Sequence, residues 1–309
     1  MSTGITERAV LFGEARTLVG IVTEPPQGAA RDTAFLMLNA GVVHRVGPNR
    51  IYVTAARRLA EQGFVVVRFD LSGLGDSGSR RDSVPFDQAS VLETRDVMSA
   101  IERDYGISRF VTTGLCSGAV VAFRAAVSDP RVLGSVLINP QGFVHSEEWT
   151  SYVVTKALAR KYWREKLLSP RSWRQALTGR SNYRQLVEVM RRRISSMFGR
   201  NTSVTRIAGD LAADFGQLKA RGIRVLLACS EGDFGVDYLA TILGSRFDRR
   251  EHMDTLTLPR GDHSLTMGAS QERFFDGLAR WAATVTRHAA APAAQAAPAA
   301  AGAVRTQLS

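Results

Sequence analysis

A cysteine lies between two glycines in the segment GLCSG, residues 114–118, directly after an apolar run of strand length. The spacing Gly-x-nucleophile-x-Gly is typical of a sharp strand-to-helix turn, in which the nucleophile has a strained backbone and the glycines avoid steric clashes. Cys116 has Gly114 and Gly118 at these places, whereas neither matching position around Ser117 is a glycine. The spacing therefore selects Cys116 as a nucleophile. The alternative is a small buried cysteine in a glycine-rich turn.

A nucleophilic thiol needs a base that removes its proton and an acid that orients the base. His263, in the segment GDH, follows a late apolar run, and Asp233, in SEGD, follows the apolar run before it. The chain order is then nucleophile, acid, base, which is a known order for such a triad. We expect His263 to take the proton of Cys116 and Asp233 to hold the other ring nitrogen. Glu231 and Asp237 are competitors for the role of the acid.

Acyl transfer also requires backbone N–H groups that bind the negative oxygen of the tetrahedral intermediate. One belongs to the residue after the nucleophile, here Ser117, and the other comes from a loop after an earlier strand. That loop reads AGVVHRVGPNR at 40–50, and Val42 is the expected donor. His44 in the same loop either faces the substrate or forms a hydrogen bond within the loop.

Apolar runs of strand length alternate with amphipathic helical stretches along most of the chain. This alternation predicts an α/β fold with a mostly parallel central sheet and helices on both faces. A leading hairpin is expected at 8–12 and 17–23. The other expected strands are 34–39, 64–69, 109–114, 132–139, 223–229 and 254–258, and the expected helices are 50–62, 87–104, 117–128 and 267–288.

The pattern is interrupted at 141–205, where helical periodicity predicts a helical cap over one edge of the sheet. The core is then expected at 1–140 and 206–288. An Ala/Pro-rich tail at 289–309 has little to bury and is expected to be disordered. Four aromatic residues of the cap are the expected lining of a substrate pocket, together with nearby apolar side chains: Trp149, Tyr152, Trp163 and Trp173.

The positive charge of the chain is concentrated in the expected cap. The whole chain has 40 Lys and Arg against 29 Asp and Glu, a formal net charge of +11, and the segment 141–205 alone has 13 against 4. A basic cap over a nearly neutral core indicates an anionic substrate, such as a carboxylate, a coenzyme A phosphate or an acidic carrier protein. The run Arg191–Arg193 has the simpler interpretation of a solvated helix face.

The composition excludes several classes of protein. The 2 cysteines among 309 residues are too few for a disulfide scaffold or a cysteine-rich zinc site. No apolar run approaches the roughly 18–20 residues of a membrane span, and the first residues lack a secretory signal, so we expect a cytoplasmic protein. GLGDSG at 73–78 matches a dinucleotide fingerprint, but a polar stretch with a proline follows instead of a helix. We therefore expect no nucleic-acid partner, no metal and no cofactor, and the sequence leaves the oligomeric state open.

Together these motifs resemble the α/β-hydrolase superfamily. The segments LNAGVVHRVGPNR, RFDLSGLGDS, GLCSGA and SEGDFGVDY are especially similar to the hydrolases associated with the exosortase A system, near the serine-aminopeptidase-like branch. The resemblance covers about residues 8–288 and implies that Cys116, Asp233 and His263 form the triad. Cysteine replaces the usual serine, as in the dienelactone hydrolases. This departure disfavours peptide cleavage and favours thioesters, activated esters, lactones or acyl transfer.

The leading hypothesis is an acyl hydrolase or acyltransferase of the ester or thioester class, acting through an acyl-Cys116 intermediate on a small-molecule or carrier-bound acyl group. A second hypothesis is an enzyme of the same fold that performs elimination or cyclisation in natural-product biosynthesis. A third is a catalytically silent binding protein, against which the presence of Asp233 and His263 argues.

Overall fold

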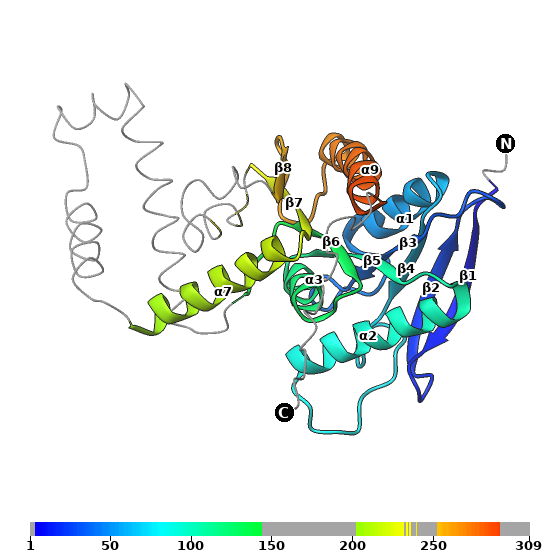
Figure 1. Cartoon of the computed structure of the whole chain (residues 1–309), viewed down its shortest axis with the longest axis horizontal. Helices are drawn as coiled ribbons and strands as arrows, with labels where there is room; N and C mark the ends of the chain where they lie inside the picture. The colour runs from blue at the N-terminus through cyan, green and yellow to red at the C-terminus, as the bar shows by residue number, and fades with distance from the viewer. Residues whose placement is uncertain are drawn as a thin grey trace, which may run out of the picture.

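The structure, a computed structural model, describes residues 4–143, 202–231 and 252–290, together with Asp233, Gly235 and Leu239. These residues contain one central sheet with helices on its two faces (Figure 1). The strands are β1 (Thr6–Phe12), β2 (Leu18–Glu24), β3 (Thr33–Leu38), β4 (Val65–Phe69), β5 (Arg109–Leu115), β6 (Val132–Ile138), β7 (Arg224–Ser230) and β8 (Met253–Leu258). The helices are the short 3-10 helix η1 (Pro48–Arg50), α1 (Ile51–Glu61), α2 (Phe86–Tyr105), α3 (Ser117–Ser128), α7 (Thr202–Ala220) and α9 (Gly268–Ala290).

The sheet has eight strands in the order β1-β2-β4-β3-β5-β6-β7-β8. β1 and β2 form the expected antiparallel hairpin, and β2 also pairs antiparallel with β4. From β4 to β8 every neighbouring pair is parallel. This is the mostly parallel sheet that the alternation of apolar runs predicts, and each expected strand and helix is present with bounds that differ by at most two residues.

The parallel strands end at a common edge of the sheet. Leu38 of β3 is in register with Gly114 of β5, and Ser230 of β7 is in register with Leu258 of β8. The chain crosses from β4 over β3 to β5, so the strand order reverses between β3 and β5. Loops at such a switch point diverge and leave room for a ligand at the carboxyl ends of the strands.

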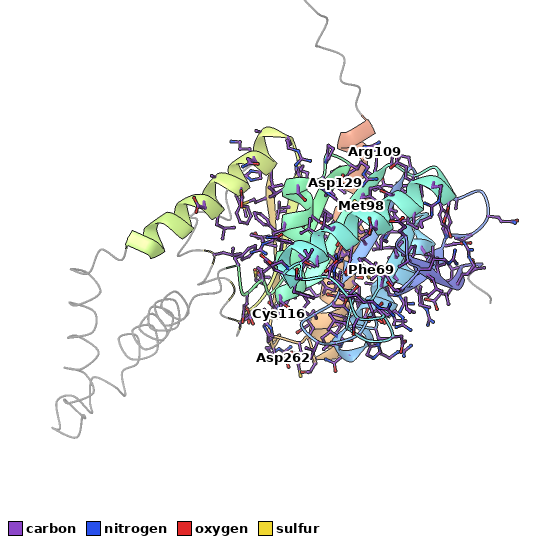
Figure 2. All side chains as sticks on the ribbon, turned by 90° about the horizontal axis from the view of Figure 1, so that it is seen from below. Phe69, Met98, Arg109, Cys116, Asp129 and Asp262 are labelled. Carbon is purple, nitrogen blue, oxygen red and sulfur yellow. The ribbon has the colours of Figure 1, made fainter. Side chains whose placement is uncertain are left out.

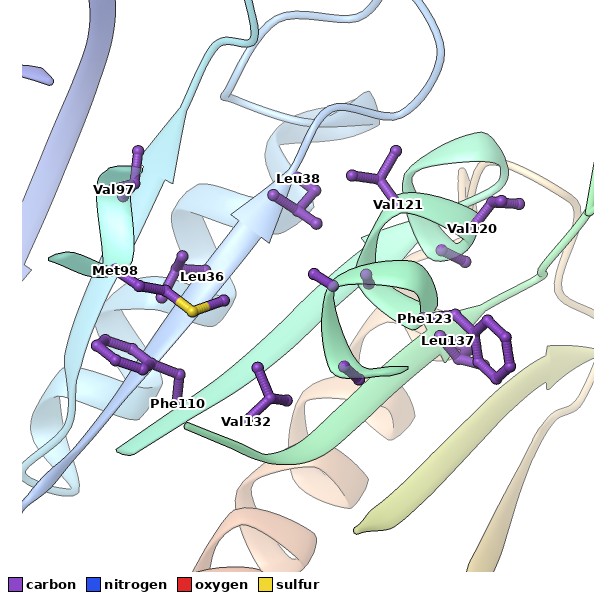
Figure 3. Close-up of a cluster of buried hydrophobic side chains, with 14 of the residues drawn as sticks. Leu36, Leu38, Val97, Met98, Phe110, Val120, Val121, Phe123, Val132 and Leu137 are labelled. Atoms are coloured by element: carbon purple, nitrogen blue, oxygen red, sulfur yellow. The ribbon is translucent and has the colours of Figure 1, made fainter. Parts of the chain in front are cut away.

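The two faces of β3 show how the sheet is packed. All six of its residues are buried, and alternate side chains enter two separate apolar clusters because side chains on a strand point in turn to opposite faces. Leu36 and Leu38 pack on the side of α2 and α3 with Met98 and Phe110, as Figure 3 shows. Phe35 and Met37 pack on the other side, beneath α1 and α9. A strand buried on both faces is typical of the centre of a parallel sheet.

Helix α7 is the main element that the sequence analysis did not anticipate. It begins at Thr202, inside the segment assigned to the cap, and continues to Ala220 across the expected boundary between cap and core. Its apolar residues Leu211, Phe215 and Leu218 are buried. At the other end of the core, α9 extends to Ala290, two residues into the expected tail.

Two phenylalanines pack against the same ring of helix α3, one from the loop after β6 and one from α7. The ring centroid of Phe123 in α3 lies 5.2 Å from that of Phe143 and 4.4 Å from that of Phe215 in α7. Arg221, just after α7, donates to the carbonyls of Ala126 and Val127 at the end of α3. A cation at a helix C-terminus satisfies carbonyls that lack an intrahelical partner.

Candidate active site

The turn between β5 and α3 has the strained backbone that the glycine spacing predicts. Cys116 has φ 59° and ψ −121°, a conformation that residues with a side chain rarely adopt. A Cβ atom on Gly114 would lie 2.1 Å from the Gly118 carbonyl carbon, and a Cβ on Gly118 would lie 2.4 Å from the Asn39 carbonyl oxygen. Both positions therefore require glycine, and the turn holds the Cys116 side chain at the carboxyl edge of the sheet.

Hydrogen bonds on both sides fix this turn. The Cys116 N–H donates to the Ile138 carbonyl of β6 at 3.0 Å. The Leu115 N–H donates to the hydroxyl of the fully buried Tyr52 at 2.9 Å. Figure 2 shows Cys116 and Asp262 near one end of the molecule, with Arg109 and Asp129 toward the opposite end. Cys116 and the loop after β8 thus share one edge of the sheet.

His263 lies between the two other predicted triad members. Its Nδ1 is 2.5 Å from Oδ2 of Asp233, whose side chain is only 2% exposed. The Cys116 side chain lies near enough to the ring to influence its protonation. The structure thus brings Cys116, His263 and Asp233 together from the ends of β5, β8 and β7.

The two neighbours change the protonation of His263. The hydrogen bond with Asp233, followed by that with Cys116, raises the pKa of His263 from 6.5 to about 10, although burial acts in the opposite direction. The negative charges of both partners add to this effect. The imidazole is therefore held as an imidazolium at neutral pH.

The competing acids differ in where their carboxylates point. Glu231 accepts a hydrogen bond from the Arg260 N–H at 3.1 Å rather than from His263. Asp262, next to the histidine, accepts the Thr266 N–H at 2.8 Å and stays within its own turn. Asp237 lies outside the described residues. Of the acidic side chains that the structure describes near the ring, Asp233 is the one within hydrogen-bond distance of His263 Nδ1.

The loop after β3 approaches the nucleophile in a tight turn. The Val43 N–H donates to the Ala40 carbonyl at 3.1 Å, and Gly41 has φ 60°, which glycine tolerates. The Gly41 N–H donates to the Ser117 hydroxyl oxygen at 3.0 Å. The next N–H, that of Val42, has no acceptor in the part of the chain that the structure describes. As the first residue of α3, Ser117 also has an N–H without an intrahelical acceptor.

A fully buried carboxylate binds the loop after β3 through hydrogen bonds and an ion pair. Asp70, directly after β4, accepts the Arg45 N–H at 2.6 Å and the Asn39 side-chain amide at 3.0 Å, and its carboxylate also pairs with the Arg45 guanidinium. A Cβ on Gly75, within GLGDSG, would lie 2.2 Å from Asp70 Oδ2. The helix α2 begins only at Phe86, so GLGDSG is a turn around this carboxylate and not a helix-opening phosphate loop.

Three polar residues that the sequence analysis did not single out connect the loops of the acid and the base. The side chain of Asn139, after β6, is fully buried and donates to the Ser230 hydroxyl and to the carbonyl of His263 at 2.9 Å. The Ser230 N–H donates back to its amide oxygen at 2.8 Å. Gln141 donates to both carboxylate oxygens of Asp233 at 3.2 Å. Each of the three closely follows or ends a strand, which is the signal that could have identified them.

The predicted substrate-binding residues divide between the loop and the cap. His44 is exposed, and its carbonyl accepts the Gly47 N–H at 2.9 Å. Most of the expected cap, residues 144–201 with Arg191–Arg193, lies outside the described residues, as do these aromatic side chains: Trp149, Tyr152, Trp163 and Trp173. Among the described helices, none is both long and apolar enough to cross a membrane. Within the described ranges, no group of three His, Cys, Asp or Glu side chains could hold a metal ion.

The sheet order, the elbow after β5, the acid after β7 and the histidine after β8 define an α/β-hydrolase fold. Comparison with family models agrees. Residues 41–238 match the family described as serine aminopeptidase, S33, so this chain belongs to that family and is a hydrolase.

Curated and solved relatives are more distant. The chain is 27% identical over 149 residues to the uncharacterized protein YcjY of Escherichia coli K12, a match that covers 46% of this chain and 42% of YcjY. It resembles the hypothetical protein PA2218 of Pseudomonas aeruginosa at 16% identity and a TM-score of 0.56, over 93% and 95% of the two chains. It also resembles the esterase PF2001 of Pyrococcus furiosus at 15% identity and a TM-score of 0.53, over 91% and 90%. These structures share the fold.

Proposed function

We propose that this hydrolase acts on activated acyl groups, esters or thioesters, through an acyl-Cys116 intermediate. The observation that carries the proposal is the pairing of His263 with Asp233 beside Cys116, whose backbone is strained. This chain has cysteine where the name of its family refers to a serine. A thiolate is a stronger nucleophile than a hydroxyl group but also a better leaving group, so good acyl donors suit it better than amides do.

In the first half-reaction, the Cys116 sulfur forms a bond to the carbonyl carbon, and the C=O electron pair moves onto the oxygen. The Ser117 and Val42 N–H groups hold this oxyanion. When the intermediate collapses, the alkoxide or thiolate leaving group departs and takes the proton of the His263 imidazolium. The product is a thioester of Cys116.

In the second half-reaction, water attacks the thioester carbonyl while neutral His263 takes one of its protons. Collapse breaks the C–S bond, releases the carboxylic acid and restores the thiolate beside the imidazolium. An alcohol in place of water gives an ester, which is acyl transfer. Asp233 stabilises the charged imidazole in both steps and holds it in the tautomer with a proton on Nδ1.

Intact-mass measurement after exposure to a small panel of acyl thioesters and esters tests the proposal. We expect a mass increase of one acyl group in the wild type and none in Cys116→Ala, which also loses turnover. Cys229 is an internal control, because burial raises the pKa of its thiol to about 12 and keeps it neutral. Unchanged turnover in Cys116→Ala would overturn the proposal. In ¹⁸O-labelled water without an alcohol acceptor, hydrolysis incorporates label into the acid, and an unlabelled product would indicate elimination or cyclisation.

The identity of the acid has a separate test. Asp233→Asn leaves His263 without its carboxylate partner, so we expect kcat to fall by about 10³–10⁴-fold. The pKa of His263 should also fall, so the alkaline limit of activity should move from near pH 10 toward neutrality. Glu231→Gln is the matched control, because Glu231 accepts the Arg260 N–H instead. Equal losses in both variants would contradict the assignment of Asp233.

A further inference from the structure

The side-chain amide of Gln141 contacts both members of the acid–base pair from a third element. Its Nε2 lies 3.2 Å from each carboxylate oxygen of Asp233 and 3.3 Å from Nδ1 of His263. Gln141 follows β6, whereas Asp233 and His263 follow β7 and β8. The pair is therefore contacted by a neutral polar group that comes from a third loop.

The geometry determines which groups donate and which accept in these contacts. When His263 Nδ1 has a proton and donates it to Asp233 Oδ2, that nitrogen cannot also accept the Gln141 N–H. Gln141 and His263 are then both donors to the same carboxylate. The Gly235 N–H is a further donor, at 2.7 Å from Oδ1. Because Gly235 binds one oxygen from the backbone, the carboxylate stays oriented without Gln141.

We propose that Gln141 is a positioning residue that shares the negative charge of Asp233 with His263 and so limits how tightly His263 holds its proton. The inference rests on the proposed function, in which His263 must give a proton to the leaving group and take one from water. A carboxylate that accepts additional hydrogen bonds is a weaker base, and it stabilises a neighbouring imidazolium less. Gln141 thus opposes the effect of Asp233 and Cys116 on the ring.

The other titratable groups around the pair do not counteract the rise in the pKa of His263. Tyr52 of α1 faces Cys116, and burial raises its pKa, so its hydroxyl stays neutral. Cys229 of β7 lies near Asp233 and is neutral too, with a pKa of about 12. The Asp262 carboxylate is bound by the N–H and hydroxyl of Thr266. Within the described part of the chain, Asp233 and Cys116 are the titratable side chains that raise the pKa of His263.

Two substitutions distinguish the effect of the Gln141 hydrogen-bond donor from the effect of its side-chain volume. Gln141→Met retains a similar volume but removes the donor, and Gln141→Glu places a second carboxylate at the same position. Loss of the donor makes Asp233 a stronger base, so the pKa of His263 should rise by about 0.5 in Gln141→Met. A second carboxylate should raise it by one unit or more, a tenfold change in proton affinity.

The measurement is the rate at which iodoacetamide alkylates Cys116 in the full chain, followed by intact mass between neutral pH and pH 11.5. The thiolate becomes a better nucleophile when His263 loses its proton, so the rate has an inflection near pH 10 in the wild type. Cys116→Ser gives the background from Cys229. We expect the inflection to rise in the order wild type, Gln141→Met, Gln141→Glu. In steady-state kinetics, kcat should fall about 3–10-fold in Gln141→Met with KM unchanged.

The outcomes are distinguishable. An inflection that is unchanged or lower in Gln141→Met overturns the inference, since the amide then adds nothing or only holds the carboxylate in place. If the wild type shows no rapid alkylation at neutral pH, the proposed function itself fails. Thermal unfolding shows whether each variant is folded. Gln141→Met keeps the inference testable if Gln141→Glu does not fold.

Discussion

Cys116 and the pair of His263 and Asp233 meet at one edge of the sheet but are positioned by different forces. Cys116 is placed by backbone sterics, because no atom larger than hydrogen fits on Gly114 or Gly118. His263 and Asp233 are placed by side-chain hydrogen bonds, above all those of the buried Asn139. Steric placement tolerates no substitution, whereas hydrogen-bonded placement degrades in steps as partners are removed. The two halves of the site should therefore respond to mutation in different ways.

The largest effect is expected on the steric side. In Gly118→Ala, the new Cβ would lie 2.4 Å from the Asn39 carbonyl oxygen, so the contact between the elbow and β3 must open. We expect a loss of about 3 kcal/mol or more in the free energy of unfolding, measured by urea denaturation, together with loss of activity. Gly209→Ala in α7 is the control, because nothing lies within 4 Å of its Cβ. It should be stabilising by about 0.5–1 kcal/mol. A stable and active Gly118→Ala variant would show that backbone sterics do not place Cys116 more strictly than hydrogen bonds place His263 and Asp233.

An intermediate effect is expected where the acid and base loops are joined. Asn139→Gly removes the side-chain hydrogen bonds to Ser230 and the His263 carbonyl while it tolerates the observed φ of 41°. We expect a loss of about 2–3 kcal/mol in stability and a 10–100-fold fall in kcat with KM nearly unchanged.

The matched control is Asn49→Gly. Asn49 also has a positive φ, 51°, and donates a single hydrogen bond to the Ser264 carbonyl from an exposed position. Its loss should change kcat by less than about threefold and stability by less than about 1 kcal/mol. Equal effects of the two substitutions would mean that burial of the amide is not what holds the pair.

The smallest effect is expected at Ser117, where the nucleophile half of the site uses a side-chain hydrogen bond. Ser117→Ala removes the acceptor of the Gly41 N–H and leaves the backbone of the elbow intact. We expect a fall in kcat of about 3–10-fold and a change in stability of at most about 1 kcal/mol. Ser128→Ala, which removes a hydrogen bond to Ala125 at the other end of α3, should leave kcat unchanged. A loss as large as that of Gly118→Ala would show that the loop, not the elbow, is the more rigid element.

The same contrast explains what the sequence could predict. The elbow depends on a local spacing of glycines, so GLCSG was sufficient to indicate the turn, the strand before it and the helix after it. The mostly parallel sheet followed from the alternation of apolar runs, whereas the order of the strands within it was not predicted. The partners of Asn139 and Gln141 are distant in the chain, and nothing in their local sequence shows which loops they will meet.

Helix α7 was not predicted for a different reason. Leu211, Phe215 and Leu218 recur at the helical spacing and are buried, so the signal was present but was not separated from the interruption before it. The roles of Cys116, Asp233, His263, Ser117 and Val42 remain predictions that the proposed experiments address.

The contact of Phe143 and Phe215 with the same ring, Phe123, bears on how this protein could diversify. The two residues are far apart in the chain, so their shared contact with Phe123 fixes both ends of a long connection on the described core. The entropic cost of a longer connection grows slowly, by about 0.6 kcal/mol for each doubling of its length. A change in the length of the chain between Phe143 and Phe215 should therefore cost the described core little stability.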